Sequence, residues 1–256
     1  MTSSSALRFV APIVVGVIIV ALWLLVVDVL HAAPRALPSP LAIGSDLGAH
    51  GDIIGEDVLI TATNAILGLL AGSLAGIILA GLAAAWRPVD GMLAPLVAAI
   101  AVVPIVAVTP ILNTMFGASS QFGRVAVAAI ASFVPVFVNV LRGLRQTRPV
   151  HRDLLRASGA TGAQTFRVLT LPTAVPYLLT GLRIAASLAV ISALVAEYFG
   201  GPIGGLGKSI TSAASSSNYP LAWAYVLGAI VLGLVFYCVA LLAEMIATRH
   251  QPGART

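Results

Sequence analysis

Histidines and carboxylates are the residues best able to do acid–base or metal chemistry, and in this sequence they are few and dispersed. The four histidines, His31, His50, His151 and His250, lack the spacing of metal ligands, so no metal site is predicted. Four acidic residues gather in one segment, at Asp46, Asp52, Glu56 and Asp57, without a partnered nucleophile. We expect these carboxylates to form a solvated face. Since no catalytic constellation emerges, the sequence does not indicate an enzyme.

The glycine-rich stretch 201–209, which ends in Gly207-Lys208-Ser209, superficially resembles a phosphate-binding loop. The pattern G-x-x-x-x-G-K-[ST] requires a glycine five residues before Gly207, and Pro202 occupies that position. No soluble strand precedes the stretch. A glycine-rich external turn is the better interpretation, and we expect the chain itself to bind no cofactor.

Two charged residues, Arg183 and Glu197, stand inside an otherwise apolar stretch. They are 14 residues apart, which is about 21 Å along a helix, so they cannot pair within it. In one interpretation, Arg183 braces the cytoplasmic half of the span and Glu197 braces the external gate. In the other, both residues lie near the membrane interfaces and extend their charged ends to water. Isolated polar residues could line a pathway or could satisfy neighbouring helices, and these are Asn113, Asn139, Ser187 and Ser192.

The elements that position these residues must lie in a membrane. Hydrophobic residues make up 59% of the 256 residues and charged residues only 9%, whereas a soluble domain carries about 25% charged residues. The net charge of +5 comes from basic residues in short gaps between apolar runs. No basic face with interleaved aromatic residues is present, which argues against nucleic acid as a partner.

About 20 apolar residues cross a bilayer, and six stretches approach that length. They are 9–30, 59–85, 92–112, 125–141, 174–199 and 222–247. The sequence therefore predicts an all-α integral membrane protein with a single transmembrane domain over residues 1–256. Prolines interrupt the third and fourth stretches, which favours positions in the protein interior or beside a pathway.

Arginines are distributed unevenly between the two sides of these six spans. With the N-terminus inside, the cytoplasmic segments hold Arg8, Arg87, Arg142, Arg145, Arg148, Arg152, Arg156, Arg167, Arg249 and Arg255. The opposite side holds Arg35, Arg124 and Lys208. This bias predicts cytoplasmic N- and C-termini.

Gly68, Gly72 and Gly76 recur at intervals of four in the second stretch. Such a row places small residues on one helix face and allows another backbone to approach closely. The row is either a packing seam, within the subunit or between two subunits, or a reflection of how common glycine is in membrane helices.

The segment 142–173 is more than a link between two spans. It is rich in arginine, and residues 153–157 are strong helix formers. A turn flanked by glycines follows at 159–162, and then a second short amphipathic helix is expected at about 163–170, before Pro172 marks re-entry into the membrane. A helix–turn–helix held between two spans is suited to being gripped by a soluble partner.

This segment resembles the EAA loop of ATP-binding-cassette (ABC) importer permeases, in which an E-A-A trio is followed after three residues by glycine, then a hydrophobic segment and L-P. Asp153-Leu154-Leu155 stands at the trio and Gly159 at the glycine, with Ala160, Phe166 and Leu171-Pro172 beyond. Aspartate keeps the charge of glutamate, while Leu-Leu for Ala-Ala is a departure.

The resemblance extends along most of the chain, to permeases of the nitrate/sulfonate/taurine type. Their L-P-S-P, P-x-x-x-x-x-F-G, T-G-L-R-I and E…G-L-G segments are matched in order at 37–40, 110–117, 180–184 and 197–207. Asn64 stands where many relatives have arginine, which puts a role for that charge in doubt.

The resemblance implies the type I importer fold and a set of partners. These are a second permease copy or a paralogue, two cytoplasmic ATPase subunits that carry ATP and Mg²⁺, and an extracytoplasmic solute-binding protein. The loop would form a coupling helix seated on the ATPase. The residues expected to couple are Asp153, Arg156, Gly159, Ala160, Phe166, Leu171 and Pro172.

We therefore expect the translocation subunit of an importer in a prokaryotic cell membrane, for a small polar or anionic organic solute of the sulfonate, taurine, nitrate or pyrimidine-precursor kind. An ATPase-independent secondary transporter is the alternative, although no inverted repeat is evident. A membrane-embedded transferase or protease would need a convergent His, Asp or Ser set.

Overall fold

The described chain is helical throughout. The computed structural model describes residues 3–30, 36–117, 120–200 and 204–249, and no strand occurs among them. The helices, in chain order, are α1 (Ser3–Leu24), η1 (Leu25–Val29), α2 (Pro40–Ala49), α3 (Gly51–Ala85), α4 (Arg87–Val102), α5 (Ile105–Phe116), α6 (Phe122–Arg145), α7 (Pro149–Ala157), α8 (Gly162–Thr165), η2 (Phe166–Thr170), α9 (Leu171–Tyr198), α10 (Leu206–Ser215) and α11 (Tyr219–Thr248). The expected all-α class is confirmed.

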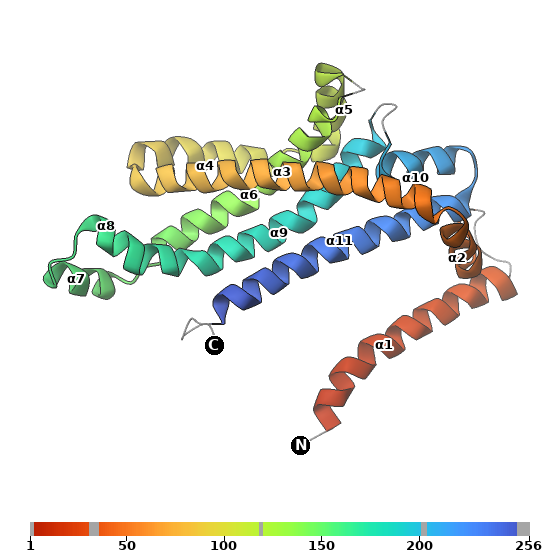
Figure 1. The fold of residues 1–256 in the computed structure, drawn as a ribbon, viewed down its shortest axis with the longest axis horizontal. Helices are drawn as coiled ribbons and strands as arrows, with labels where there is room; N and C mark the ends of the chain where they lie inside the picture. Colours follow the sequence, from red (N-terminus) through yellow and green to blue (C-terminus); the bar gives the residue numbers. More distant parts are fainter. Residues whose placement is uncertain (1–2, 31–35, 118–119, 201–203, 250–256) are drawn as a thin grey trace.

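The long helices α3, α6 and α9 pack along one another at the centre of the molecule (Figure 1). Gly68, Gly72 and Gly76 lie on the face of α3 that meets α6. A Cβ at Gly72 would run into the carbonyl of Ala129, and one at Gly76 would come within 3.1 Å of the Phe133 carbonyl oxygen. The missing side chains thus allow the two backbones to touch inside one subunit.

A second close approach joins α6 to α9. A Cβ at Gly143 would lie 3.0 Å from the Cα of Ala174, and one at Gly181 would lie 3.1 Å from the Pro135 carbonyl oxygen. Glycine therefore sets the spacing at both seams of the central layer, α3 against α6 and α6 against α9.

The third expected span, 92–112, is not one straight helix. It corresponds to α4 and α5, whose axes are bent by 96° at a short break. The break lies at Val103 and Pro104: proline has no N–H to continue the ladder and forces the preceding residue into an extended conformation, with ψ 122° at Val103. The helical pattern starts again where the Ala107 amide donates to the Pro104 carbonyl, at 2.9 Å. Pro104, which was expected to interrupt a span, therefore changes the direction of the chain between α4 and α5.

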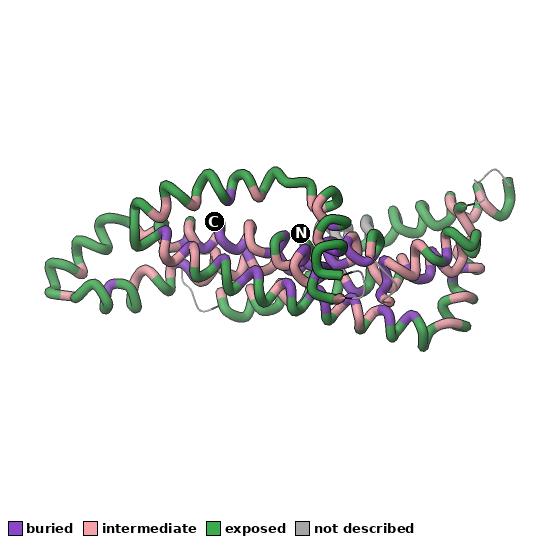
Figure 2. Tube along the Cα trace, turned by 90° about the horizontal axis from the view of Figure 1, so that it is seen from above, coloured by how far each residue is buried: buried purple, intermediate pink, exposed green. Residues whose placement is uncertain are grey.

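The remaining helices lie around this centre. Helix α11 packs on α9, and α10 covers the end of α9 and α11 (Figure 1). Helix α1 runs apart from the central layer and approaches the rest near α2, where the rings of Trp23 and Trp223 meet with centroids 5.8 Å apart. Buried positions concentrate along the central helices (Figure 2).

Four helical units of the described residues are long and apolar enough to cross a membrane: Gly51–Ala85, Phe122–Arg145, Gly162–Tyr198 and Tyr219–Thr248. The bent pair of α4 and α5 makes a fifth if it is one span. In the expected first span, the apolar helix Ile13–Val29 is shorter than these. The count of six spans therefore stays a prediction.

Candidate coupling loop and buried polar cluster

Glu197, near the end of α9, is fully buried, with 0% of its surface exposed. Its carboxylate accepts hydrogen bonds from the Thr61 hydroxyl at 2.7 Å, the Asn64 side-chain amide at 3.0 Å and the Gly207 backbone amide at 3.2 Å. Helix α3 and the start of α10 thus converge on one charged group of α9. A carboxylate held this way cannot snorkel to an interface, and we call the assembly around it the Glu197 cluster.

Arg124, from the first turn of α6, contributes the positive charge of the cluster. Only 1% of its surface is exposed, and its guanidinium donates to the Gly204 carbonyl at 2.7 Å. Electrostatic attraction links it to Glu197. The sequence assigned Arg124 to the side opposite the cytoplasm, and the structure shows that its side chain is buried in the cluster rather than exposed in a loop. The cation facing Glu197 comes from α6, whereas α3 contributes the neutral side-chain amide of Asn64.

Asp57, on α3, closes the other side of the cluster. Its carboxylate accepts from the Gly205 amide at 2.7 Å and from the Ser209 hydroxyl. Because the residue is buried, the expectation of a solvated acidic face is wrong for this member. Gly205 has φ +117°, and a Cβ there would lie within 2.6 Å of the Glu197 carboxyl carbon, so the turn requires glycine.

The cluster ties α3, α6, α9 and the start of α10 into one unit. Buried charges are costly unless they are paired and hydrogen-bonded, and within the described residues each of these three charged groups has partners. The arrangement holds no nucleophile–base pair, so its chemistry is that of a structural lock.

Arg183 joins α9 to α11. Its guanidinium lies 3.1 Å from the carboxylate of Glu244, which also accepts from the Thr180 hydroxyl at 2.7 Å. Both ends of the ion pair are largely shielded. The structure therefore places Arg183 in a brace between two helices, with a partner that sequence reasoning missed. Glu244 is the only acidic residue of the last apolar run, which is the signal that could have revealed it.

The four isolated polar residues singled out in the sequence lie in different surroundings. The Asn113 side chain is buried and donates to the Ala196 carbonyl at 3.1 Å, whereas that of Asn139 donates to the Pro135 carbonyl within its own helix at 2.7 Å. Ser187 faces a cavity among α9, α10 and α11. Ser192 is buried, with 3% of its surface exposed. Among the described residues, no hydrogen bond joins any two of these four side chains.

The connecting loop, residues 142–173, includes the last residues of α6, and the exposed helix α7 follows at Pro149. Asp153 and Arg156 lie one turn apart, 3.9 Å from each other and more than 70% exposed. Gly159 ends the helix with φ +78°. Its amide donates to the Arg156 carbonyl at 3.0 Å, and the Ala160 amide donates to the Leu155 carbonyl at 2.9 Å. Such a left-handed C-terminal turn is typical of glycine.

The second half of the loop is the start of the long α9 unit. Thr161 and Gln164 form a reciprocal capping box that begins α8. The helix then continues through η2, which holds Phe166, into α9 without a break. The helix expected at 163–170 is therefore present, but it does not end there and runs on into α9. Leu171 and Pro172 lie at the junction, where the wider turn of η2 leaves room for a residue without an amide hydrogen.

The loop exposes an amphipathic surface. Large apolar side chains of α7 and η2 are uncovered at Val150, Leu154 and Val168, and they lie among the arginines. Contiguous exposed apolar groups mark interaction sites. Among residues singled out in the sequence, His31, Arg35, the stretch 201–203, His250 and Arg255 lie outside the described residues.

Comparisons with known proteins agree with this architecture. Residues 72–253 match the family described as "Binding-protein-dependent transport system inner membrane component". An ABC transporter permease protein of Haemophilus influenzae is 27% identical over 90% of this chain and 94% of its own length. The formylaminopyrimidine transport permease protein ThiX of Halalkalibacterium halodurans is 36% identical over 65% of this chain and 67% of its own.

A solved structure shares the fold. It is described as an amino acid ABC transporter with histidines, and it superposes with a TM-score of 0.65 at 18% identity. The match covers 78% of this chain and 96% of the other.

Proposed function

Because this chain belongs to the family of binding-protein-dependent transport system inner membrane components, and is an ABC importer permease of the type I fold, we propose that its connecting loop couples it to separate ATPase subunits. The observation that carries this proposal is the exposed, arginine-rich helix α7, ended at Gly159 and held between two central helices. Its uncovered apolar and basic side chains suit a groove on a soluble protein.

The continuity of α9 supplies a physical route for the coupling. From Gly162 to Tyr198 the chain runs as one helix of 37 residues, about 55 Å long at 1.5 Å per residue. A displacement of α7 by a closing ATPase pair would move this helix as a rigid element. Its far end carries Glu197, so the Glu197 cluster would feel the movement directly. Differential contact of the loop with two ATPase states would then bias two arrangements of the spans.

Partners and orientation follow from the same proposal. Two ATPase subunits bind ATP and Mg²⁺, a second copy of this chain or a paralogue completes the pathway, and a solute-binding protein delivers cargo from outside. The arginines of the loop and of the α6 end, Arg142 and Arg145, favour a cytoplasmic loop. Both termini would then be cytoplasmic.

The cargo is a small polar or anionic organic solute. The relative ThiX is named a formylaminopyrimidine transport permease protein, which supports a pyrimidine-precursor-like compound among the options. Asn113 and Asn139 are engaged in hydrogen bonds within the subunit. We therefore assign most of the selectivity to the binding protein.

Co-purification with the ATPase tests the coupling role. The wild-type chain, co-expressed with its ATPase, is expected to retain it through affinity purification in detergent. Gly159→Leu should insert normally but lose the ATPase, because leucine cannot adopt φ +78° without strain.

Gly44→Leu is the matched control for that substitution. A Cβ at Gly44 meets nothing within 4 Å, and the residue lies in α2, away from the loop. Normal retention of the ATPase by Gly159→Leu would contradict the coupling assignment.

A further inference from the structure

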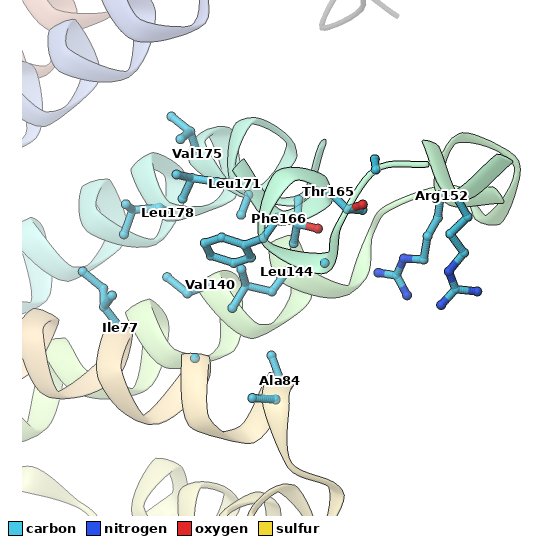
Figure 3. A pocket seen from close by; sticks show the side chains of 17 residues that line it. Ile77, Ala84, Val140, Leu144, Arg152, Thr165, Phe166, Leu171, Val175 and Leu178 are labelled. Atoms are coloured by element: carbon cyan, nitrogen blue, oxygen red, sulfur yellow. The ribbon is translucent and has the colours of Figure 1, made fainter. Parts of the chain in front are cut away.

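A cavity of about 570 Å³ lies between the end of α3, the end of α6 and the start of α9, beneath the connecting loop (Figure 3). Its wall is mostly apolar, and includes Ile77, Val140, Leu144, Phe166, Leu171 and Leu178. The volume falls within the range of roughly 300–1,000 Å³ typical of ligand pockets. The central seams and the Glu197 cluster do not use this space.

The rim of the cavity is cationic. Arg152 and Arg156 both line it, one helical turn apart on α7, and Figure 3 shows two guanidinium groups side by side at this edge. Arg152 donates to the Thr147 hydroxyl at 3.0 Å, which leaves other N–H groups of its guanidinium available. Asp153 lies 3.9 Å from Arg156 with both side chains exposed, a contact too weak to neutralise the pair.

The depth of the cavity in the membrane follows from α3. The wall includes Ala84 and Ala85, the last residues of that long apolar helix. The next residues are Trp86, which is 58% exposed, and Arg87. Tryptophan and arginine at the end of a span mark the boundary between hydrocarbon and headgroups. The apolar interior therefore reaches into the hydrocarbon layer, while the arginine rim lies at headgroup level.

We propose that this cavity binds an anionic phospholipid from the adjacent leaflet, with an acyl chain in the apolar interior and the phosphate between Arg152 and Arg156. Guanidinium groups bind phosphate oxygens through paired, charge-assisted hydrogen bonds. An apolar chain joined to an anionic headgroup matches both the wall and the rim, which neither a free anion nor a neutral lipid does. The bound lipid fastens the connecting loop to the end of α3. Arg156 also belongs to the surface proposed to couple to the ATPase. The test therefore uses the membrane subunit without ATPase, so that a failure of lipid binding is distinguishable from a failure of coupling.

Native mass spectrometry of the purified full-length chain in detergent tests the site. The probes are phosphatidylglycerol, phosphatidylcholine with the same acyl chains, and inorganic phosphate as a competitor. We expect one phosphatidylglycerol to bind, at least tenfold tighter than phosphatidylcholine, and millimolar phosphate not to displace it. Equal binding of the two lipids would overturn the role of the arginine rim. Displacement by phosphate alone would overturn the role of the acyl chain.

Two variants with matched controls locate the binding. Arg152→Gln should weaken the binding of phosphatidylglycerol about tenfold, since a hydrogen bond to a charged group is lost. Its control, Arg167→Gln, removes an arginine of the same loop that lies outside the cavity wall, and should bind phosphatidylglycerol normally. Gly81→Leu should abolish binding by filling the cavity, where a Cβ meets nothing within 4 Å. Gly55→Leu, an equally open position on the same helix, should bind normally.

Equal effects of each variant and its control would refute the site. Should Gly81→Leu not fold, the pair Arg152→Gln and Arg167→Gln decides alone.

Discussion

Replacing Glu197 with alanine should destabilise the folded chain by about 3–5 kcal/mol. The substitution removes the acceptor of three hydrogen bonds, from Thr61, Asn64 and Gly207, and leaves them buried without it. It also removes the negative charge that attracts Arg124, whose surface is only 1% exposed. Breaking a buried charge pair by removing one partner costs about that much.

The assay is reversible unfolding of the purified chain in mixed detergent and SDS micelles, followed by helicity. Glu56→Ala, which removes an exposed acid of α3, is the control and should change the unfolding free energy by no more than about 0.5 kcal/mol. A double-mutant cycle of Glu197→Ala with Thr61→Val should give a coupling energy of about 1–3 kcal/mol. A loss below about 1 kcal/mol for Glu197→Ala would refute the view that the cluster locks these helices.

Three further substitutions test other contacts. Gly72→Ala should destabilise the chain by about 1–3 kcal/mol in the same unfolding assay, because its Cβ meets the α6 backbone, while Gly55→Ala should be neutral or slightly stabilising; equal effects would contradict the seam. Arg183→Met should lower the free energy of unfolding by about 1–3 kcal/mol, because Glu244 loses its ion-pair partner. Adding Glu244→Gln should restore most of that free energy. No recovery would contradict the brace between α9 and α11. Gly159→Asn should retain more ATPase in co-purification than Gly159→Ala, because asparagine tolerates the left-handed conformation; the reverse order would contradict the role of that turn.

Local features of the chain were predictable from the sequence because they depend on neighbours along it. Apolar runs predicted α3, α6, α9 and α11, and the glycines at 159 and 162 predicted the turn after α7. The all-α class, the membrane setting and the family resemblance follow from such local patterns, and the structure and the comparisons agree with them.

Contacts between distant segments were not predictable in this way. Thr61 and Glu197 are 136 positions apart, and no local pattern relates Asp57 to Gly205 or Arg124 to Gly204. Asp57 and Arg124 therefore looked like charges outside the spans. A lone charge beside an apolar run was the available signal, but it does not name its partner.

The effects of two prolines on the helices were not predictable from the sequence. Pro104 bends the chain by 96° between α4 and α5, where one span was expected. Pro172, expected to mark re-entry into the membrane after a short helix, lies inside one continuous helix that runs from Gly162 to Tyr198. The outcome depends on whether neighbouring carbonyls find other partners, which is a tertiary property.

Uptake into proteoliposomes shows whether this chain moves solute only when an ATPase drives it. The chain is reconstituted with its ATPase subunits and its binding protein, and the cargo is a radiolabelled solute that the binding protein binds in calorimetry. We predict uptake that requires ATP and the ATPase subunits together, and none with the membrane subunit alone. Equal uptake by the membrane subunit without ATPase or ATP would contradict the account.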